Sequence, residues 1–189
     1  MSRQVINNLQ QRGNAFSVVL HDSGADVFKS ASHIFTKMMC SGKDLLLCAV
    51  IEHSMDYDQE LKQYKPKHYH MVLTFDGCYR VQTIINLIID QFHCNLNQVG
   101  CEKVNSVPKQ IRYLIHLDDF DKYQYSKSGI VTNKSQAVEE YLSLVTIYDL
   151  NDCVRIVQKY RYDLEKIMTS VTNYDSYRKY INDLIVNFL

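Results

Sequence analysis

The chain has 189 residues, of which 46% are hydrophobic, and its 21 basic residues balance 21 acidic ones, so its formal net charge is zero. With 6 glycines and 2 prolines, this composition excludes an intrinsically disordered chain and a collagen-like repeat, and the length indicates one domain with at most a small appendage. The balance of charge also argues against a protein that coats DNA by bulk attraction alone.

Strand and helix patterns alternate along the chain up to about residue 105. The apolar patterns predict strands at residues 15–21, 44–53, 68–75 and 98–104, and helices at residues 25–39 and 81–92. Residues 56–67 are polar and charged, which is typical of a loop. The order β-α-β-β-α-β is that of the ferredoxin-like, split βαβ arrangement, an α+β fold with one antiparallel sheet and helices on one face. The other face of the sheet is expected to be free to carry a site.

The rest of the chain is predicted to be mainly helical. Ser106 is a candidate N-cap for a helix that ends at about Leu117, and residues 118–134 are polar and lack periodicity. From about residue 135 the pattern is helical throughout, but these roughly 55 residues are too few to bury much core alone. We therefore expect one domain at residues 1–134 and a helical domain at 135–189, which packs on the first domain or on copies of itself.

The cysteine pattern and the lack of long apolar stretches favour an intracellular protein. Six cysteines are scattered without a C-x-x-C pair, and a chain of this length needs no disulfides to hold its core, so we expect reduced, buried thiols. The longest apolar stretches have about eight residues, far short of the roughly 20 that span a bilayer, and the N-terminus has no apolar signal core. We expect a soluble, cytoplasmic protein without membrane contact.

The most distinctive motif is a His-Tyr-His sequence formed around His68 and His70. Alternate side chains of a strand point to the same face, so the two imidazoles would lie side by side and could chelate a metal. If this strand forms a hairpin with the preceding one, His53 and Asp56 fall beside the pair. Three imidazoles and a carboxylate suit Mn²⁺ or a related divalent ion, with positions left open for substrate. The alternative is two surface histidines on a half-exposed strand.

A second candidate site lies on the helix predicted after residue 106. Lys109, Tyr113 and His116 would share one face of this helix, at spacings of four and seven residues. A tyrosine beside a metal can attack a phosphodiester and form a covalent intermediate. Because a free phenol has a pKa of about 10, it needs a nearby cation to make its phenolate accessible. With 14 tyrosines in the chain, packing or solvent contact is the alternative for any one of them.

In combination, these motifs resemble the HUH endonuclease superfamily. Within it, they are most similar to the small plasmid-encoded rolling-circle replication initiators that use a single tyrosine. The resemblance spans roughly residues 15–134. It is carried by His68-Tyr69-His70, by Tyr113-Leu114-Ile115-His116 with the segment that continues to Asn133, and by His53-Ser54-Met55-Asp56.

The resemblance implies a metal-dependent nickase and strand transferase. His53, Asp56, His68 and His70 would bind a divalent metal, Mn²⁺ foremost with Mg²⁺ as the other candidate, and Tyr113 would be the nucleophile. It would nick one strand of DNA at a plasmid replication origin, at a single-stranded or cruciform site. The products would be a 5′-phosphotyrosine and a 3′-OH that primes leading-strand synthesis, with later rejoining of the strand.

Neighbouring residues have open roles. Lys109 and Arg112 flank the tyrosine and could hold DNA phosphates, or could be solvated helix charges. His116 could tune the tyrosine or complete the metal site, or could be structural. Asp118 and Asp119 could activate water when replication terminates, since the motif holds one tyrosine, or could belong to the solvated surface.

The remaining expectations concern the helical tail, residues 135–189, and two competing functions. In similar initiators this region assembles subunits into rings, which implies that residues 135–189 form a homo-oligomer, with a hexamer as one candidate; the alternative is an intramolecular cap. Two other functions stay open, a relaxase or transposase of the same superfamily and a non-enzymatic origin-binding or repressor protein. Residues 1–134 hold 15 basic and 13 acidic groups, so zero net charge does not exclude an enzyme that reads DNA through a local face.

Overall fold

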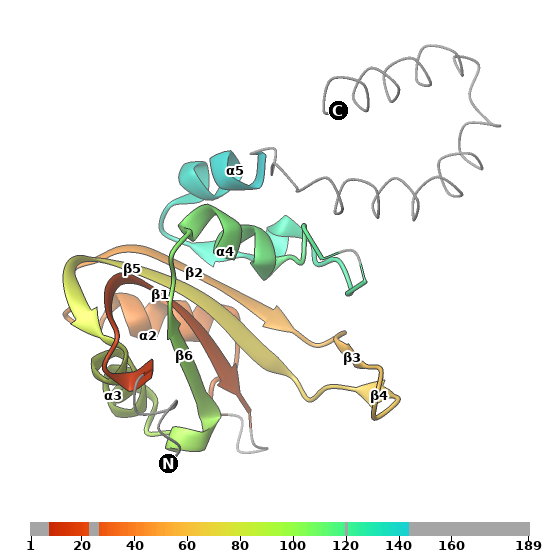
Figure 1. The fold of residues 1–189 in the computed structure, drawn as a ribbon, viewed down its shortest axis with the longest axis horizontal. Helices are drawn as coiled ribbons and strands as arrows, with labels where there is room; N and C mark the ends of the chain where they lie inside the picture. The colour runs from red at the N-terminus through yellow and green to blue at the C-terminus, as the bar shows by residue number, and fades with distance from the viewer. Residues whose placement is uncertain (1–7, 23–26, 120, 144–189) are drawn as a thin grey trace, which may run out of the picture. The chain divides into compact units, whose positions relative to one another are not determined.

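A computed structural model describes residues 8–22, 27–119 and 121–143 of the chain (Figure 1). The chain divides into two compact units, Met1–Leu144 and Val145–Leu189, and the second lies outside the described residues. The predicted domain boundary at residue 134 and the predicted assembly of the tail into a homo-oligomer therefore stay predictions. No helix within the described ranges is long and apolar enough to cross a membrane.

The described residues form an α+β fold around a five-stranded antiparallel sheet with the strand order β6-β1-β5-β2-β7. The strands are β1 (Arg12–His21), β2 (Leu45–His53), β5 (His68–Arg80), β6 (Val99–Lys103) and β7 (Val131–Thr132). Strand β5 follows β2 in the chain but lies between β1 and β2 in the sheet, which is the split βαβ arrangement. The structure therefore confirms the predicted fold class.

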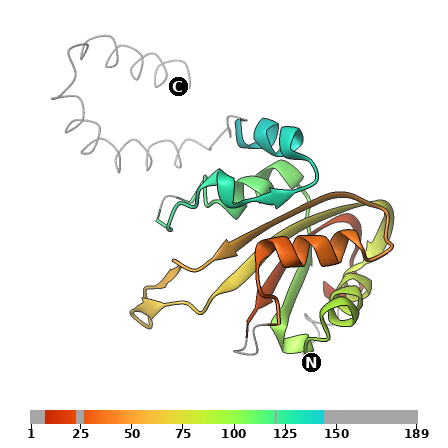
Figure 2. The ribbon, with the colours of Figure 1, turned by 180° about the vertical axis from the view of Figure 1, so that it is seen from behind.

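Helices cover both faces of the sheet (Figures 1 and 2). Helices α2 (Ala31–Met39) and α3 (Val81–Phe92) pack on one face, and α4 (Val107–Leu114) and α5 (Ser135–Ser143) pack on the other. The expectation that the second face is free was wrong. Apolar side chains of α4 and Val138 of α5 join those of β2 and β5 in a second hydrophobic cluster, so this face is buried as well.

The alternation of side chains along β2 and β5 positions the candidate site. Ile51 and Val72 belong to the cluster under α4, so every second residue along their strands faces the same side. In the register of the two strands, Ile51 pairs with His70, and His53 pairs with His68. The apolar residues on this face are therefore followed by three histidines at the connected end of the β2–β5 hairpin, where β2 ends and β5 begins.

Several local features differ from the predictions. Helix α2 begins at Ala31 and not at residue 25, and β5 continues past residue 75 to Arg80. Helix α4 ends at Leu114, short of Leu117, because His116 adopts a left-handed backbone conformation with φ of 55°. Strand β7 was missed because Val131–Thr132 is only two residues long. The predicted loop at 56–67 contains a two-stranded ribbon, β3 (Tyr57–Asp58) and β4 (Gln63–Tyr64).

The five cysteines within the described residues are free thiols, but only some of them are buried. Cys48 and Cys94 are buried, and burial raises the pKa of Cys48 to about 12. Cys40 and Cys78 are exposed, which contradicts the expectation of uniformly buried thiols. Cys153 lies outside the described residues.

Candidate active site

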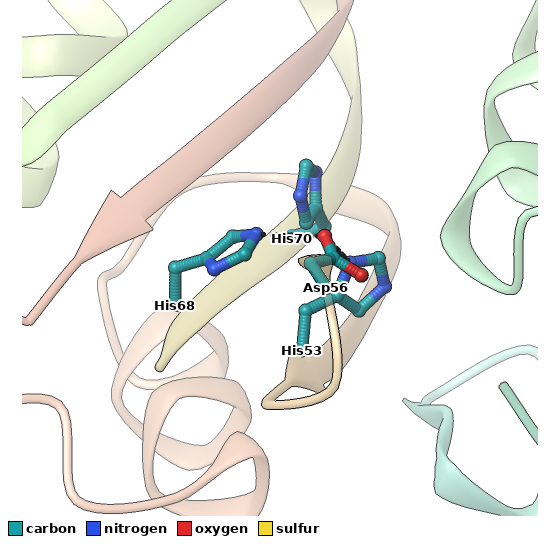
Figure 3. Close-up of side chains that lie close together, drawn as sticks. All are labelled: His53, Asp56, His68 and His70. Carbon is teal, nitrogen blue, oxygen red and sulfur yellow. Dashed lines mark hydrogen bonds and ion pairs between the residues drawn. The ribbon is translucent and has the colours of Figure 1, made fainter. Parts of the chain in front are cut away.

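Four of the predicted site residues come together at the end of the β2–β5 hairpin where the connecting segment leaves β2 and enters β5 (Figure 3). His53 ends β2, His68 begins β5 opposite it, and His70 follows on the same face, while Asp56 reaches in from the loop after β2. One nitrogen or oxygen atom of each lies within 4.8 Å of the corresponding atoms of the others. The three histidines are buried and the carboxylate is half-buried. We call these four residues the His-Asp cluster.

Two backbone carbonyls determine which imidazole nitrogens face the centre of the cluster. Nε2 of His53 lies 2.7 Å from the carbonyl oxygen of Leu114, and Nδ1 of His68 lies 2.9 Å from that of Pro66. A carbonyl oxygen only accepts, so each of these nitrogens carries the proton that it donates. In the neutral rings, Nδ1 of His53 and Nε2 of His68 then present lone pairs, and each lies 3.3 Å from Oδ2 of Asp56.

This donor set fits a divalent cation. Metal-binding histidines commonly donate their second nitrogen to a carbonyl or carboxylate, as both rings do here. Two lone pairs that face a carboxylate oxygen repel one another unless a cation or protons lie between them. Nδ1 of His70 is also buried and has no hydrogen-bond partner among the described residues.

The protonation states of the cluster also suit a metal. Burial, with a smaller contribution from the neighbouring His53 and His68, lowers the pKa of His70 to about 2, so this imidazole stays neutral. Burial raises the pKa of Asp56, but protons that His53, His68 and Tyr125 present to its carboxylate outweigh burial and hold this pKa well below its usual range, as a cation in the same place would. The cluster thus offers an ionised carboxylate and a neutral imidazole, the forms in which these side chains bind metals.

Tyr113 lies beside the cluster with a cation at its phenol oxygen. Its ring contacts the rings of His70 and His116 edge-on, with centroids 5.7 and 5.3 Å away. Nζ of Lys122 donates to the phenol oxygen at 3.1 Å, and an ion pair with Asp119 at 2.8 Å holds this lysine in place. Lys122 is thus the nearby cation that a nucleophilic tyrosine requires.

Tyr125 fixes two members of the cluster and was not predicted from the sequence. Its ring stacks on that of His53, with centroids 4.0 Å apart and an interplanar angle of 9°. Its hydroxyl donates to Oδ1 of Asp56 and accepts from the backbone N–H of Met55, each at 2.9 Å. Tyr125 and Lys122 both lie in residues 118–134, which lack periodicity. The only sequence signal for them was that this segment belongs to the family resemblance.

His116 lies next to the cluster, although it does not share a helical face with Tyr113. Its Nδ1 donates to the carbonyl oxygen of Tyr123 at 2.8 Å, and its ring centroid lies 4.6 Å from that of His53. Burial lowers its pKa, which keeps the ring neutral. These contacts make His116 a packing partner for the rings of Tyr113 and His53.

Arg112 has a structural role that the sequence did not predict. Its Nε and Nη2 donate to the two carboxylate oxygens of Asp118 at 2.8 and 2.5 Å, and its Nη1 donates to the carbonyl oxygen of Leu142 at 3.0 Å. The side chain is buried and connects α4 to the following loop and to α5. Asp118 and Asp119 are likewise engaged by Arg112 and Lys122, whereas Lys109 is exposed on α4 and available for a phosphate.

The two predicted phosphate-binding residues are therefore expected to behave differently on substitution. Arg112→Ala should lower the free energy of unfolding by about 3 kcal/mol, because it leaves Asp118 without its bidentate partner. Lys109→Ala should leave stability unchanged and reduce by about one the slope of log affinity for DNA against log salt concentration. Urea unfolding and binding titrations at several salt concentrations measure both effects.

Lys37→Ala, an exposed lysine on α2 at the opposite face of the sheet, is the matched control and should change neither quantity. A smaller salt slope for Arg112→Ala at unchanged stability would assign the DNA contact to Arg112 instead.

Comparison with known proteins places this site within a family. The family described as plasmid replication protein, origin binding domain, matches residues 8–139, which include all the site residues above. A replication protein of Staphylococcus aureus is 28% identical over 94 residues, 50% of this chain and 44% of the relative. The replication protein RepB of Lactiplantibacillus plantarum is 29% identical over 107 residues, 55% of this chain and 47% of the relative. The matched regions thus cover less than half the length of these relatives. Since the family match extends over well more than half of the chain, the chain belongs to the plasmid replication proteins, with its origin-binding domain at residues 8–139.

Proposed function

We propose that this protein initiates plasmid replication by nicking one strand of the origin, with Tyr113 as the nucleophile and a divalent metal in the His-Asp cluster. One juxtaposition carries the proposal. The phenol of Tyr113, whose oxygen accepts a hydrogen bond from Lys122, lies in ring contact with His70 of the cluster. A nucleophile and a set of metal ligands in contact are what strand cleavage through a covalent intermediate requires.

The metal would be held by His53, Asp56, His68 and His70. When bound, it would supply Lewis acidity that offsets the charge on the scissile phosphate. Three imidazoles with one carboxylate favour Mn²⁺, because Mg²⁺ prefers oxygen ligands throughout. Mg²⁺ remains the second candidate.

The side chains of the protein perform the proton and bond changes. Lys122 orients the phenol oxygen of Tyr113 and stabilises its negative charge as the proton leaves. The oxygen then forms a bond to phosphorus, and the bond from phosphorus to the 3′ oxygen breaks, so the 3′ oxygen takes up a proton and leaves as a hydroxyl. The product is a 5′-phosphotyrosine whose ester bond retains the energy needed for later rejoining of the strand.

Labelled DNA provides a direct test of this chemistry. An origin oligonucleotide presented as a single strand or hairpin loop is incubated with the full chain and Mn²⁺. A label at the 3′ end should become covalently attached to protein, whereas a label at the 5′ end should appear on a free fragment that a polymerase can extend. Mass spectrometry should locate the attached nucleotide on Tyr113.

The alternatives give different products in the same assay. Attachment of the 5′-labelled fragment would reverse the proposed polarity, and cleavage without any adduct would exclude a tyrosine nucleophile. An uncut strand that stays bound would favour the non-enzymatic origin-binding protein. Cleavage confined to a transfer origin or an element end would favour a relaxase or transposase.

A further inference from the structure

The chain between His53 and His68 forms a projecting ribbon that the proposed chemistry does not use. Strands β3 and β4 pair antiparallel, and Figure 1 shows them beyond the end of the main sheet. Oδ1 of Asp58 accepts hydrogen bonds from the backbone N–H groups of Glu60 and Leu61 and so closes the turn. We call residues 54–67 the arm.

The arm concentrates apolar surface that nothing in the described residues covers. Eight large hydrophobic side chains are exposed in the described ranges, and half of them lie in the arm: Met55 (41%), Tyr57 (45%), Leu61 (68%) and Tyr64 (61%). Tyr57 and Tyr64 lie opposite each other in the ribbon, with ring centroids 5.4 Å apart in an edge-to-face pair. Two-residue strands cannot bury a core of their own, so these side chains add nothing to a hydrophobic core and indicate a binding surface.

The position of the arm relates this surface to the His-Asp cluster. Asp56 directly precedes β3, and its carbonyl oxygen accepts the backbone N–H of Lys65 at 2.7 Å, which closes the base of the arm. At the other end of the arm, the carbonyl of Pro66 orients His68. Tyr57 thus directly follows Asp56 of the cluster in the chain, and Tyr64, which pairs with Tyr57, directly precedes Lys65 at the base of the arm.

We propose that the arm binds unpaired bases of the DNA strand that is to be cut, by stacking them on Tyr57, Tyr64 and Leu61. This inference rests on the proposed function in one respect, which is that the strand to be cut lies at the His-Asp cluster. Aromatic side chains interleaved with cations are the usual surface for single-stranded nucleic acid. Lys62 and Lys65 are exposed in the arm, and their ammonium groups suit the phosphates of the same strand.

Two other occupants fit the arm less well. Duplex DNA keeps its bases stacked on one another, so they offer no faces to the tyrosines. A second copy of this chain would need roughly 800 Å² of contact from each partner, far more than a two-stranded ribbon with two-residue strands provides. Unpaired bases need only single side chains to stack on, at the spacing of the bases along one DNA strand.

The test is a binding measurement on the full chain with EDTA, so that no cleavage occurs. The probes are an oligo-dT of about 16 nucleotides with one 2-aminopurine, and a fully paired duplex of two complementary strands. The double substitution Tyr57→Ala and Tyr64→Ala should weaken oligo-dT binding about tenfold and abolish the quenching of 2-aminopurine, because the stacking partner is lost. Duplex affinity and the melting temperature should change little. The double substitution to phenylalanine should restore binding and quenching.

Two leucines outside the arm provide matched controls. Leu46 and Leu96 are each 50% exposed, and Leu46→Ala and Leu96→Ala should leave oligo-dT binding unchanged, whereas Leu61→Ala should weaken it. Equal losses for oligo-dT and duplex would overturn the inference in favour of a duplex contact. Unchanged DNA binding with a change of mass in light scattering would overturn it in favour of contact between copies.

The inference and the proposed function fail in different ways. If the chain does not nick DNA but the arm variants lose oligo-dT, the proposed function fails and the inference stands. If the chain nicks DNA and the arm variants bind oligo-dT with full affinity and quenching, the inference alone fails.

Discussion

Tyr113→Phe is expected to reduce nicking of origin DNA by at least about 10⁴-fold and to eliminate the covalent adduct, because the phenol oxygen is the attacking atom. The substitution removes one hydrogen bond, from Lys122, at a half-buried position, so stability and origin binding should be retained. The measurements are nicking of supercoiled origin plasmid, transfer of a 3′-labelled strand to protein, and binding titration of the same DNA.

Tyr123→Phe is the matched control, because Tyr123 is an exposed neighbour whose backbone carbonyl, and not its hydroxyl, contacts His116. It should nick at the rate of the unsubstituted protein. A Tyr113→Phe protein that still forms a covalent adduct would show that another residue is the nucleophile, and the proposed mechanism would be wrong.

Asp56→Asn is expected to abolish Mn²⁺ binding and nicking together. The amide has no charge to balance the cation, and its NH₂ group can donate to the lone pairs of His53 and His68, which leaves them unavailable to the metal. Mn²⁺ at 100 times its dissociation constant should stabilise the unsubstituted protein by about 2.7 kcal/mol and should leave the variant unaffected. Thermal unfolding with Mn²⁺ and with EDTA measures this difference.

Asp90→Asn on the exposed side of α3 is the control and should keep the full response to Mn²⁺. The stabilisation by Mn²⁺ should weaken on acidification, because metal binding needs unprotonated imidazoles. The pKa of an unperturbed imidazole is about 6.5. Burial lowers the pKa of His70 to about 2, so this ligand does not compete for protons in that range. An Asp56→Asn protein that Mn²⁺ stabilises normally would place the metal elsewhere.

The fold and the histidines of the His-Asp cluster could be predicted where side chains follow the period of a helix or of a strand. The apolar spacing of residues 81–92 gave the bounds of α3 correctly, since one buried face every 3.6 residues specifies a helix. The two-residue period of β2 and β5 brought His53, His68 and His70 to one face, because the hairpin pairs them.

The remaining site residues could not be predicted because tertiary contacts, and not local pattern, position them. Tyr125 is held by the backbone carbonyl of Ile115 and by Asp56, which is 69 residues away in the chain. The end of α4 has no glycine or proline to mark it. The left-handed conformation of His116 ends the helix and allows the chain to turn back and bring Lys122 to Tyr113. The helical spacing of Arg112 predicts an exposed cation. The side chain is buried instead, where it donates to the carbonyl oxygen of Leu142 in α5.

The hydrogen bond from His53 to the carbonyl oxygen of Leu114 has a mechanical consequence. Leu114 directly follows Tyr113, so one peptide segment both carries the proposed nucleophile and sets the rotation of a proposed metal ligand. This carbonyl is among those that a helix leaves unsatisfied at its C-terminal end, and the partial negative charge there makes the imidazole a stronger electron donor. A displacement of the backbone at Tyr113 and Leu114 therefore also shifts the hydrogen bond that orients the ring of His53, so the positions of the proposed nucleophile and of a proposed metal ligand are coupled.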